Sequence, residues 1–235
     1  MSNHRKMPMA GGTSSARPAR DDATIAHDVS GSRQVVIVVD DDESMRVAMT
    51  YLFRSMDIAV KVYRSAAELL GSELPDMPRC LVLDIRLPGV NGLDLQDQLA
   101  RQGVRIPIVF MTGHGDIAMS VRAMKAGAVD FLTKPFRDQD MLDAVMRALE
   151  EDRRWRRSEC AFSELRARYA TLTPRQSEMF RSVTSGLLNK QIAGMLDVSE
   201  VTIKIHRGIM MKKMGARSVA DLVRMAEALG IKTTT

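Results

Sequence analysis

Hydrophobic residues between Gln34 and residue 150 alternate between short β-branched runs and longer segments with helical spacing. The runs predict strands, and the spaced segments predict helices after each of them. The predicted strands cover residues 35–39, 58–63, 81–84, 106–111 and 128–133. The predicted helices cover residues 45–56, a short segment from 66, 91–103, 116–126 and a long segment from 138. Regular alternation of this kind predicts an α/β fold with a doubly wound, five-stranded parallel sheet.

Polar residues follow four of these strands, at the point where each strand ends. Asp40 and Asp41 follow the first strand, Asp84 ends the third, Thr112 follows the fourth, and Lys134 follows the fifth. The carboxyl ends of parallel strands meet at one edge of a sheet, where ligands collect. The sequence therefore predicts a crevice with three carboxylates, a hydroxyl and an ammonium group.

Asp84 taken alone is either a solvated turn residue or a nucleophile. Three carboxylates close together are costly unless a cation lies among them, and hard oxygen ligands suit Mg²⁺. With Lys134 and Thr112 available for phosphoryl oxygens, the set is suited to forming and keeping an aspartyl phosphate. The competing interpretation, a solvated acidic loop with a surface Lys134, requires all these residues to fall at strand ends by coincidence.

Residues 34–150 resemble the receiver domain of a two-component response regulator. The resemblance is carried by these segments: Val39-Asp-Asp-Asp-Glu43, Asp84-Ile-Arg-Leu-Pro-Gly-Val-Asn-Gly92, Met111-Thr-Gly-His-Gly-Asp116, Lys125-Ala-Gly-Ala-Val-Asp-Phe131 and Lys134-Pro-Phe136. It implies a flavodoxin-like fold in which Asp84 accepts a phosphoryl group from a sensor histidine kinase.

The same resemblance implies roles for the neighbours of Asp84. The implied Mg²⁺ ligands are Asp40, Asp41, Asp84 and the backbone carbonyl of Arg86. Because three aspartates are consecutive, Asp42 is an alternative to one of the first two. Thr112 and Phe131 are the implied switch pair, and Thr112 and Lys134 assist at the phosphoacceptor.

A magnesium phosphohydrolase of the haloacid dehalogenase type is the rival chemistry at such a strand end. Those enzymes need a second acid two residues after the nucleophile, to protonate the leaving group. Here that position is Arg86. A lasting phosphoryl mark therefore fits the sequence better than turnover.

Composition divides the chain further. Residues 34–150 hold thirteen Lys or Arg against seventeen Asp or Glu, whereas residues 171–235 hold ten against five. An acidic first part and a basic end suggest different partners for the two parts, and the basic end is the one to test for nucleic-acid binding. Residues 1–33, rich in Ser, Gly, Pro, Arg and Asp, are predicted to be disordered, and residues 151–170 a helical linker. Without a membrane-length apolar run or a secretory signal, a cytoplasmic protein is expected.

The sequence contains clear start and stop signals for helices from residue 172 onwards. Thr173 and Gln176 form a capping box, with Pro174 at the first helical position, and Gly186 follows that helix. Further caps are predicted at Asn189, Ser199 and Ser218, and the last two helices end near Gly215 and Gly230. The short connection at 197–198 is typical of a helix-turn-helix. Residues 171–235 are therefore predicted to form a small all-α four-helix domain.

The third of these helices has two faces. Ile203, Met210 and Met214 form a predicted core stripe, while Lys204 and Lys212 lie on another side with Val201, Ile205 and Gly208. A bland amphipathic helix would show the same lysines, but this second face also suits a DNA major groove. There Lys204 would reach a base or phosphate, and Ile205 a thymine methyl group.

Residues 172–220 resemble the LuxR-type helix-turn-helix. The matching segments are Leu172-Thr-Pro-Arg175, Asn189-Lys-Gln-Ile-Ala193, Val198-Ser199, Thr202-Ile-Lys-Ile-His-Arg207 and Lys213-Met-Gly215. The DNA-binding residues expected from the helix pattern and this resemblance are Lys190, Thr202, Lys204, Ile205, His206, Arg207 and Lys212. Two residues depart from the common pattern: Gln176 replaces Glu in the capping box, and Gly208 lies inside the recognition helix, at a cost of about 1 kcal/mol relative to Ala.

The two resemblances together indicate the FixJ-like subgroup of response regulators. They imply a DNA-binding transcriptional regulator, expected to be an activator and not an enzyme, that forms a homodimer on phosphorylation. Its expected partners are a sensor histidine kinase and promoter DNA, with RNA polymerase as a further candidate and no membrane. The alternatives are a constitutive DNA-binding protein with a vestigial receiver, and the magnesium phosphohydrolase.

Overall fold

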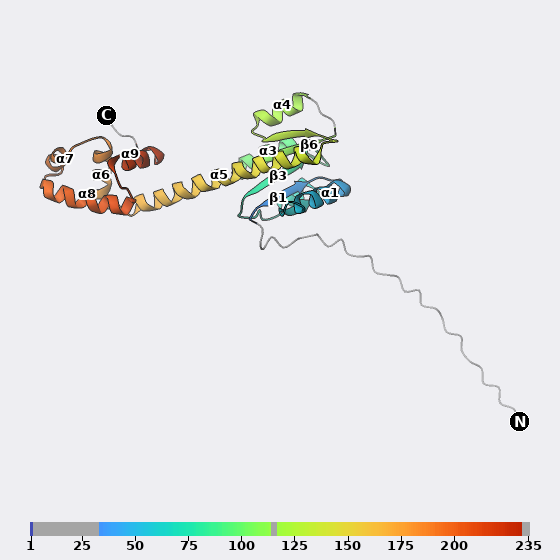
Figure 1. Ribbon diagram of the computed structural model, residues 1–235, viewed down its shortest axis with the longest axis horizontal. Coiled ribbons are helices and arrows are strands. Elements are labelled where there is room, and N and C mark those ends of the chain that lie inside the picture. Colours follow the sequence, from blue (N-terminus) through green and yellow to red (C-terminus); the bar gives the residue numbers. More distant parts are fainter. Residues whose placement is uncertain (2–32, 114–116, 232–235) are drawn as a thin grey trace.

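The first domain of the protein is built on a five-stranded parallel sheet in the order β2-β1-β3-β6-β7 (Figure 1). The computed structural model describes residues 1, 33–113 and 117–231. The sheet strands are β1 (Val35–Val39), β2 (Ala59–Tyr63), β3 (Arg79–Asp84), β6 (Ile108–Thr112) and β7 (Asp130–Thr133). The central position of β1 and β3 explains their continuous apolar sequences, because both of their faces are buried. The predicted doubly wound, flavodoxin-like sheet is confirmed.

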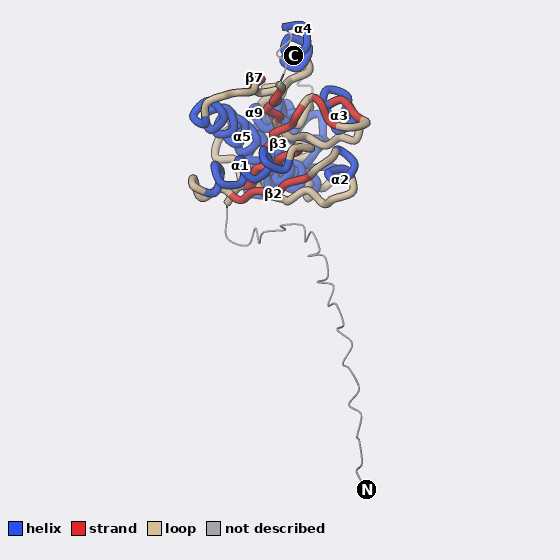
Figure 2. Tube along the Cα trace, turned by 90° about the vertical axis from the view of Figure 1, so that its right-hand side faces the viewer, coloured by secondary structure: helices blue, strands red, loops and turns tan. Residues whose placement is uncertain are grey.

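Helices cover both faces of this sheet, because successive side chains of each strand point to opposite faces. One face is covered by α1 (Glu43–Arg54) and the first half of α5 (Asp138–Ala170). The other is covered by α2 (Ala66–Leu70), α3 (Gly92–Arg101) and α4 (Ile117–Lys125). Figure 2 shows α1 and α5 on one side of the strands and α2 and α3 on the other.

Local details differ from the sequence prediction. Directly after β3, the strands β4 (Arg86–Leu87) and β5 (Val90–Asn91) form a small antiparallel hairpin that the sequence pattern did not indicate. β6 and β7 each begin two residues later than predicted. Asp116, the predicted first residue of the fourth helix, and almost all of the predicted disordered segment 1–33 lie outside the described residues.

The helix α5 is continuous for 33 residues and passes the predicted domain boundary at residue 150 without a break. Figure 1 shows it running from the sheet domain to the C-terminal helices. Residues 151–170, which were predicted to be helical, are therefore part of α5. Among the described residues, no helix is both long enough and apolar enough to span a membrane.

The C-terminal domain consists of α6 (Pro174–Thr184), α7 (Asn189–Leu196), α8 (Glu200–Met214) and α9 (Val219–Ala228) around one core. The predicted caps Thr173, Ser199 and Ser218 each accept a hydrogen bond from a backbone N–H of the first turn. The predicted cap Asn189 is wrong. Leu188 occupies the capping position, where its backbone N–H donates to Gln191 Oε1 at 2.8 Å, and Asn189 is already the first helical residue.

Candidate functional site

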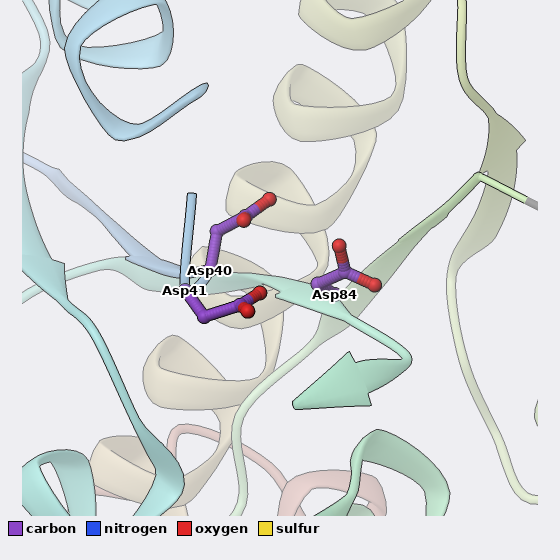
Figure 3. Close-up of side chains that lie close together, drawn as sticks. All are labelled: Asp40, Asp41 and Asp84. Atoms are coloured by element: carbon purple, nitrogen blue, oxygen red, sulfur yellow. The ribbon is translucent and has the colours of Figure 1, made fainter. Parts of the chain in front are cut away.

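The predicted group of polar side chains comes together at the carboxyl edge of the sheet. Asp40 directly follows β1, and its backbone N–H donates to the carbonyl of Tyr63 at the end of β2. Asp84 ends β3 in register with Met111 of β6, and Thr112 of β6 is in register with Thr133 of β7. One carboxylate oxygen from each of Asp40, Asp41 and Asp84 lies within 4.8 Å of the others. Figure 3 shows the three side chains at this edge.

Lys134 joins two of these carboxylates. Its Nζ donates to Asp40 Oδ2 and to Asp84 Oδ2, both at 2.7 Å. Asp40 is fully buried, and Asp84 is also buried, with 7% of its surface accessible. Burial raises the pKa of Asp40, against the opposing hydrogen bond from Lys134. Burial alone would lower the pKa of Lys134, but its hydrogen bonds to both carboxylates outweigh this effect and raise it.

The donor set fits a magnesium ion. Three carboxylates face a single ammonium group, so negative charge is left over, and all the ligand atoms are hard oxygens. Asp41 is exposed, and no described residue donates a hydrogen bond to its carboxylate. Arg86 follows Asp84 by two residues, and its backbone N–H donates to Asp84 Oδ1 at 2.9 Å. The role of the Arg86 carbonyl as a Mg²⁺ ligand stays a prediction.

Asp42 has a different task from its two neighbours. Its Oδ1 accepts a hydrogen bond from the Ser44 N–H at 2.8 Å and caps α1. Its own N–H donates to Asp40 Oδ1 at 2.9 Å, which holds the Asp40 carboxylate in place. The structure thus brings Asp40 and Asp41, and not Asp42, into the group with Asp84.

Arg46 is a supporting residue that the sequence analysis missed. Its Nη1 donates to the carbonyls of Asp40 and Asp41, at 2.8 and 2.9 Å. The guanidinium therefore fixes the backbone of the acidic turn from the first turn of α1. A basic residue shortly after an acidic strand end was the available signal, but it also fits an exposed helix face.

The predicted switch residues lie on adjacent strands. Thr112 is fully buried and its carbonyl accepts a hydrogen bond from the Lys134 N–H at 2.7 Å. Phe131 lies in β7, in register with Phe110, and is partly buried against the core that α2, α3 and α4 cover. Their role as a switch stays a prediction.

The second candidate site is the exposed face of α8. Ile203, Met210 and Met214 are buried as predicted, at 1%, 0% and 0% exposure. The opposite side presents Lys204 and Ile205, with Ile205 59% exposed. An apolar side chain left this open beside a lysine on a helix-turn-helix suits a DNA groove better than a protein core.

The other predicted DNA residues fall into two groups. Lys190 and Lys212 are exposed, and His206 is half-buried. Thr202 and Arg207 are instead engaged within the domain: the Thr202 hydroxyl lies 2.8 Å from Ser199 Oγ, and Arg207 Nη1 donates to Asn189 Oδ1 at 2.9 Å. The second contact orients α8 on α7, so Arg207 has a packing task whether or not it reaches a phosphate.

Family models match both domains of the chain. Residues 36–146 match the model described as response regulator receiver domain, and residues 170–226 match that of bacterial regulatory proteins, luxR family. An acidic receiver site joined to a helix-turn-helix defines a transcriptional response regulator of a two-component system. This class implies a histidine kinase partner and DNA binding.

Individual relatives show which family of response regulators the chain belongs to. Nodulation protein W of Bradyrhizobium diazoefficiens is 54% identical over 205 residues, covering 87% of this chain and 90% of the relative. Transcriptional regulatory protein FixJ of Azorhizobium caulinodans is 40% identical over 196 residues, covering 83% and 93%. The solved structure of the response regulator StyR is similar with 44% identity and a TM-score of 0.76, covering 83% of this chain and 98% of that one. The chain belongs to the FixJ-like family of response regulators.

Proposed function

We propose that Asp84 is the phosphoacceptor of this regulator. The observation that carries the proposal is the contact of Asp84 Oδ2 with Lys134 Nζ at 2.7 Å, at the carboxyl edge of the sheet beside Asp40 and Asp41. A carboxylate oxygen of Asp84 attacks the phosphorus of a kinase phosphohistidine. The P–N bond breaks, its electron pair stays on the imidazole nitrogen, and an aspartyl phosphate forms.

Residues around Asp84 stabilise the charge that the transfer brings in. Lys134 already holds Asp84 and can pair with a phosphoryl oxygen, and the Thr112 hydroxyl can donate to another. Asp40, Asp41, Asp84 and the Arg86 carbonyl would hold Mg²⁺. When bound, the ion neutralises phosphoryl oxygens during the transfer. Arg86 offers no acid for leaving-group protonation, so the site favours keeping the phosphoryl group over turnover.

Phosphorylation is proposed to favour a homodimer through α4 and β7. α4 presents an apolar row at helical spacing, with Ile117, Val121 and Met124 exposed by 81%, 46% and 46%. Movement of Thr112 toward the phosphoryl group, with Phe131 following, would alter the adjoining strand ends. Pairing two chains raises the effective concentration of the second DNA-binding domain, so weak single-domain binding becomes useful. RNA polymerase is the candidate partner of the DNA-bound dimer.

The experiment that tests this function compares promoter affinity before and after acetyl phosphate treatment. We expect tighter binding after treatment, and one stable phosphoryl group per chain without multiple turnover of phosphomonoesters. Equal affinity in both states would favour the vestigial-receiver alternative, since the DNA-binding domain would then act alone. Repeated hydrolysis of phosphomonoesters would instead favour the phosphohydrolase.

Lys204→Ala tests the groove assignment. Loss of one base or phosphate contact is expected to weaken promoter binding by about 1–3 kcal/mol and, for a phosphate contact, to reduce the salt slope by about one. The measurement is a gel shift at several salt concentrations with the phosphorylated protein. Arg181→Ala, an exposed basic residue on α6, is the matched control. Unchanged affinity and salt slope in Lys204→Ala would exclude this lysine from the interface.

A further inference from the structure

Asp152 is a buried carboxylate at the point where α5 leaves the sheet domain. It is 1% exposed. Its Oδ2 accepts two hydrogen bonds, from the backbone N–H of Arg79 at 3.0 Å and from Arg156 Nε at 2.7 Å. Arg156 Nη1 in turn donates to Asp76 Oδ1 at 2.7 Å. We call Asp152, Arg156 and Arg79 the Asp152 cluster; Asp76 lies at its exposed margin.

Further contacts hold the same turns of α5 against the sheet. The Arg105 guanidinium stacks over the Trp155 ring, 5.2 Å from its centroid. Arg153 Nη2 donates to Gln34, the residue before β1. Residues 152–156 of α5 therefore contact the amino edge of the sheet, the edge opposite Asp84.

The Asp152 cluster is expected to add little to the free energy of unfolding. Asp152 Oδ1 is buried without a hydrogen-bond partner among the described residues, and so is Arg79 Nε. An unmet buried acceptor costs about 1–3 kcal/mol, and buried ion pairs are often replaceable by apolar residues without loss. A buried charge of this kind serves better to fix one geometry than to increase the free energy of unfolding.

The Asp152 cluster lies between the two candidate sites, because β3 leads from it to Asp84 and α5 leads from it to α8. Arg79 is the first residue of β3, and Asp84 is the last residue of the same strand. At the other end of α5, Lys213 Nζ donates to the Thr171 carbonyl at 2.9 Å. Arg168 Nη1 donates to the Met214 carbonyl at 3.4 Å. Both partners lie at the C-terminal end of α8, the helix proposed to read DNA.

We propose that Asp152 is a positioning residue that fastens α5 to the strand carrying Asp84 and thereby sets the orientation of α8. One continuous set of hydrogen-bonded elements runs from β3 through the Asp152 cluster to α5. It continues to the C-terminal end of α8 through the contacts of Lys213 with Thr171 and of Arg168 with Met214. This connection runs along the amino edge of the sheet and is separate from the Thr112–Phe131 pair. It rests on the proposed role of Asp84 as phosphoacceptor.

Asp152→Asn is the direct test, because asparagine has the same size and can still accept from the Arg79 N–H, but it lacks the charge that pairs with Arg156. In the full-length protein we expect phosphoryl uptake and the promoter affinity of the unphosphorylated form to stay within twofold of wild type. The gain in affinity on phosphorylation is expected to fall at least fivefold, the lower end of ordinary allosteric coupling. Asp76→Asn is the matched control, since the Asp76 side chain is 99% exposed and its hydrogen bond goes to Arg156 and not to Asp152; its gain should stay at the wild-type level.

A purely structural role predicts a different pattern. It would lower the melting temperature of Asp152→Asn and leave the affinity gain intact, and that result would overturn the proposal. If Asp152→Asn does not fold, Arg156→Gln takes its place, because it leaves the Asp152–Arg79 hydrogen bond available; a wild-type gain in that variant would equally overturn the proposal. Trp155, the only tryptophan of the chain, reports the seating of α5 through its emission. Failure of the phosphoacceptor assignment is recognised separately, by an affinity gain that survives in Asp84→Asn.

Discussion

Asp84→Asn is expected to carry no phosphoryl label after incubation with a cognate kinase or acetyl phosphate, and its promoter affinity should not respond to either. The amide has the shape of the carboxylate but lacks the negative oxygen that attacks phosphorus. Asparagine has the same size as aspartate, and Asp84 lies at the end of β3, so the substitution should leave the packing of β3 intact. Circular dichroism and thermal unfolding check that the fold is retained.

The matched control for Asp84→Asn is Asp42→Asn, which removes a carboxylate two residues from Asp40. Asp42 caps α1 through Ser44, and asparagine is an equally good cap, so neither stability nor labelling should change. Normal labelling of Asp84→Asn would remove Asp84 from its proposed role. Loss of labelling in Asp42→Asn would show that the metal group includes the third aspartate.

Asp41→Asn is expected to lower Mg²⁺ affinity by about 100-fold or more. Even outer residues of metal sites commonly contribute 10–100-fold, and Asp41 is a proposed direct ligand. Because its carboxylate is exposed and accepts no hydrogen bond from a described residue, the substitution should not disturb folding. Calorimetric titration with Mg²⁺ gives the affinity, and labelling with acetyl phosphate gives the rate.

The labelling rate of Asp41→Asn should recover when Mg²⁺ is raised, because Asp84 itself is intact. Chelation with EDTA should suppress labelling in both the wild type and the variant. A variant that binds Mg²⁺ as tightly as the wild type would assign the ion to other ligands. Wild-type labelling in EDTA would remove the metal from the mechanism altogether.

The acidic site could be predicted from the sequence because its members obey a simple topological rule. Asp40, Asp84, Thr112 and Lys134 all end or follow strands, and parallel strands bring such residues to one edge. The helix caps Thr173, Ser199 and Ser218 were equally accessible, since a cap bonds only two or three residues ahead.

Contacts between distant segments could not be predicted in the same way. Asp152 bonds the backbone of Arg79, 73 positions earlier, and an acidic residue in an arginine-rich helix reads as part of a solvated face. Arg46 was missed for a different reason: its contacts with the Asp40 and Asp41 carbonyls are local, but a basic residue at that position also fits an exposed helix face. The β4–β5 hairpin was missed because its strands are only two residues long, too short to show an alternating pattern. Asn189 shows a third cause: its side chain pairs with Arg207 of another helix, and so does not cap its own.

The length of α5 has a mechanical consequence. Its 33 residues make a rod roughly 50 Å long, of which roughly 27 Å lies beyond Asp152. On that arm, a tilt of about 5° at the edge of the sheet would carry the far end through roughly 2 Å, comparable to the length of a hydrogen bond. In the proposed dimer, a strand movement of less than an ångström near Asp84 would therefore change whether two copies of α8 match the spacing of a promoter.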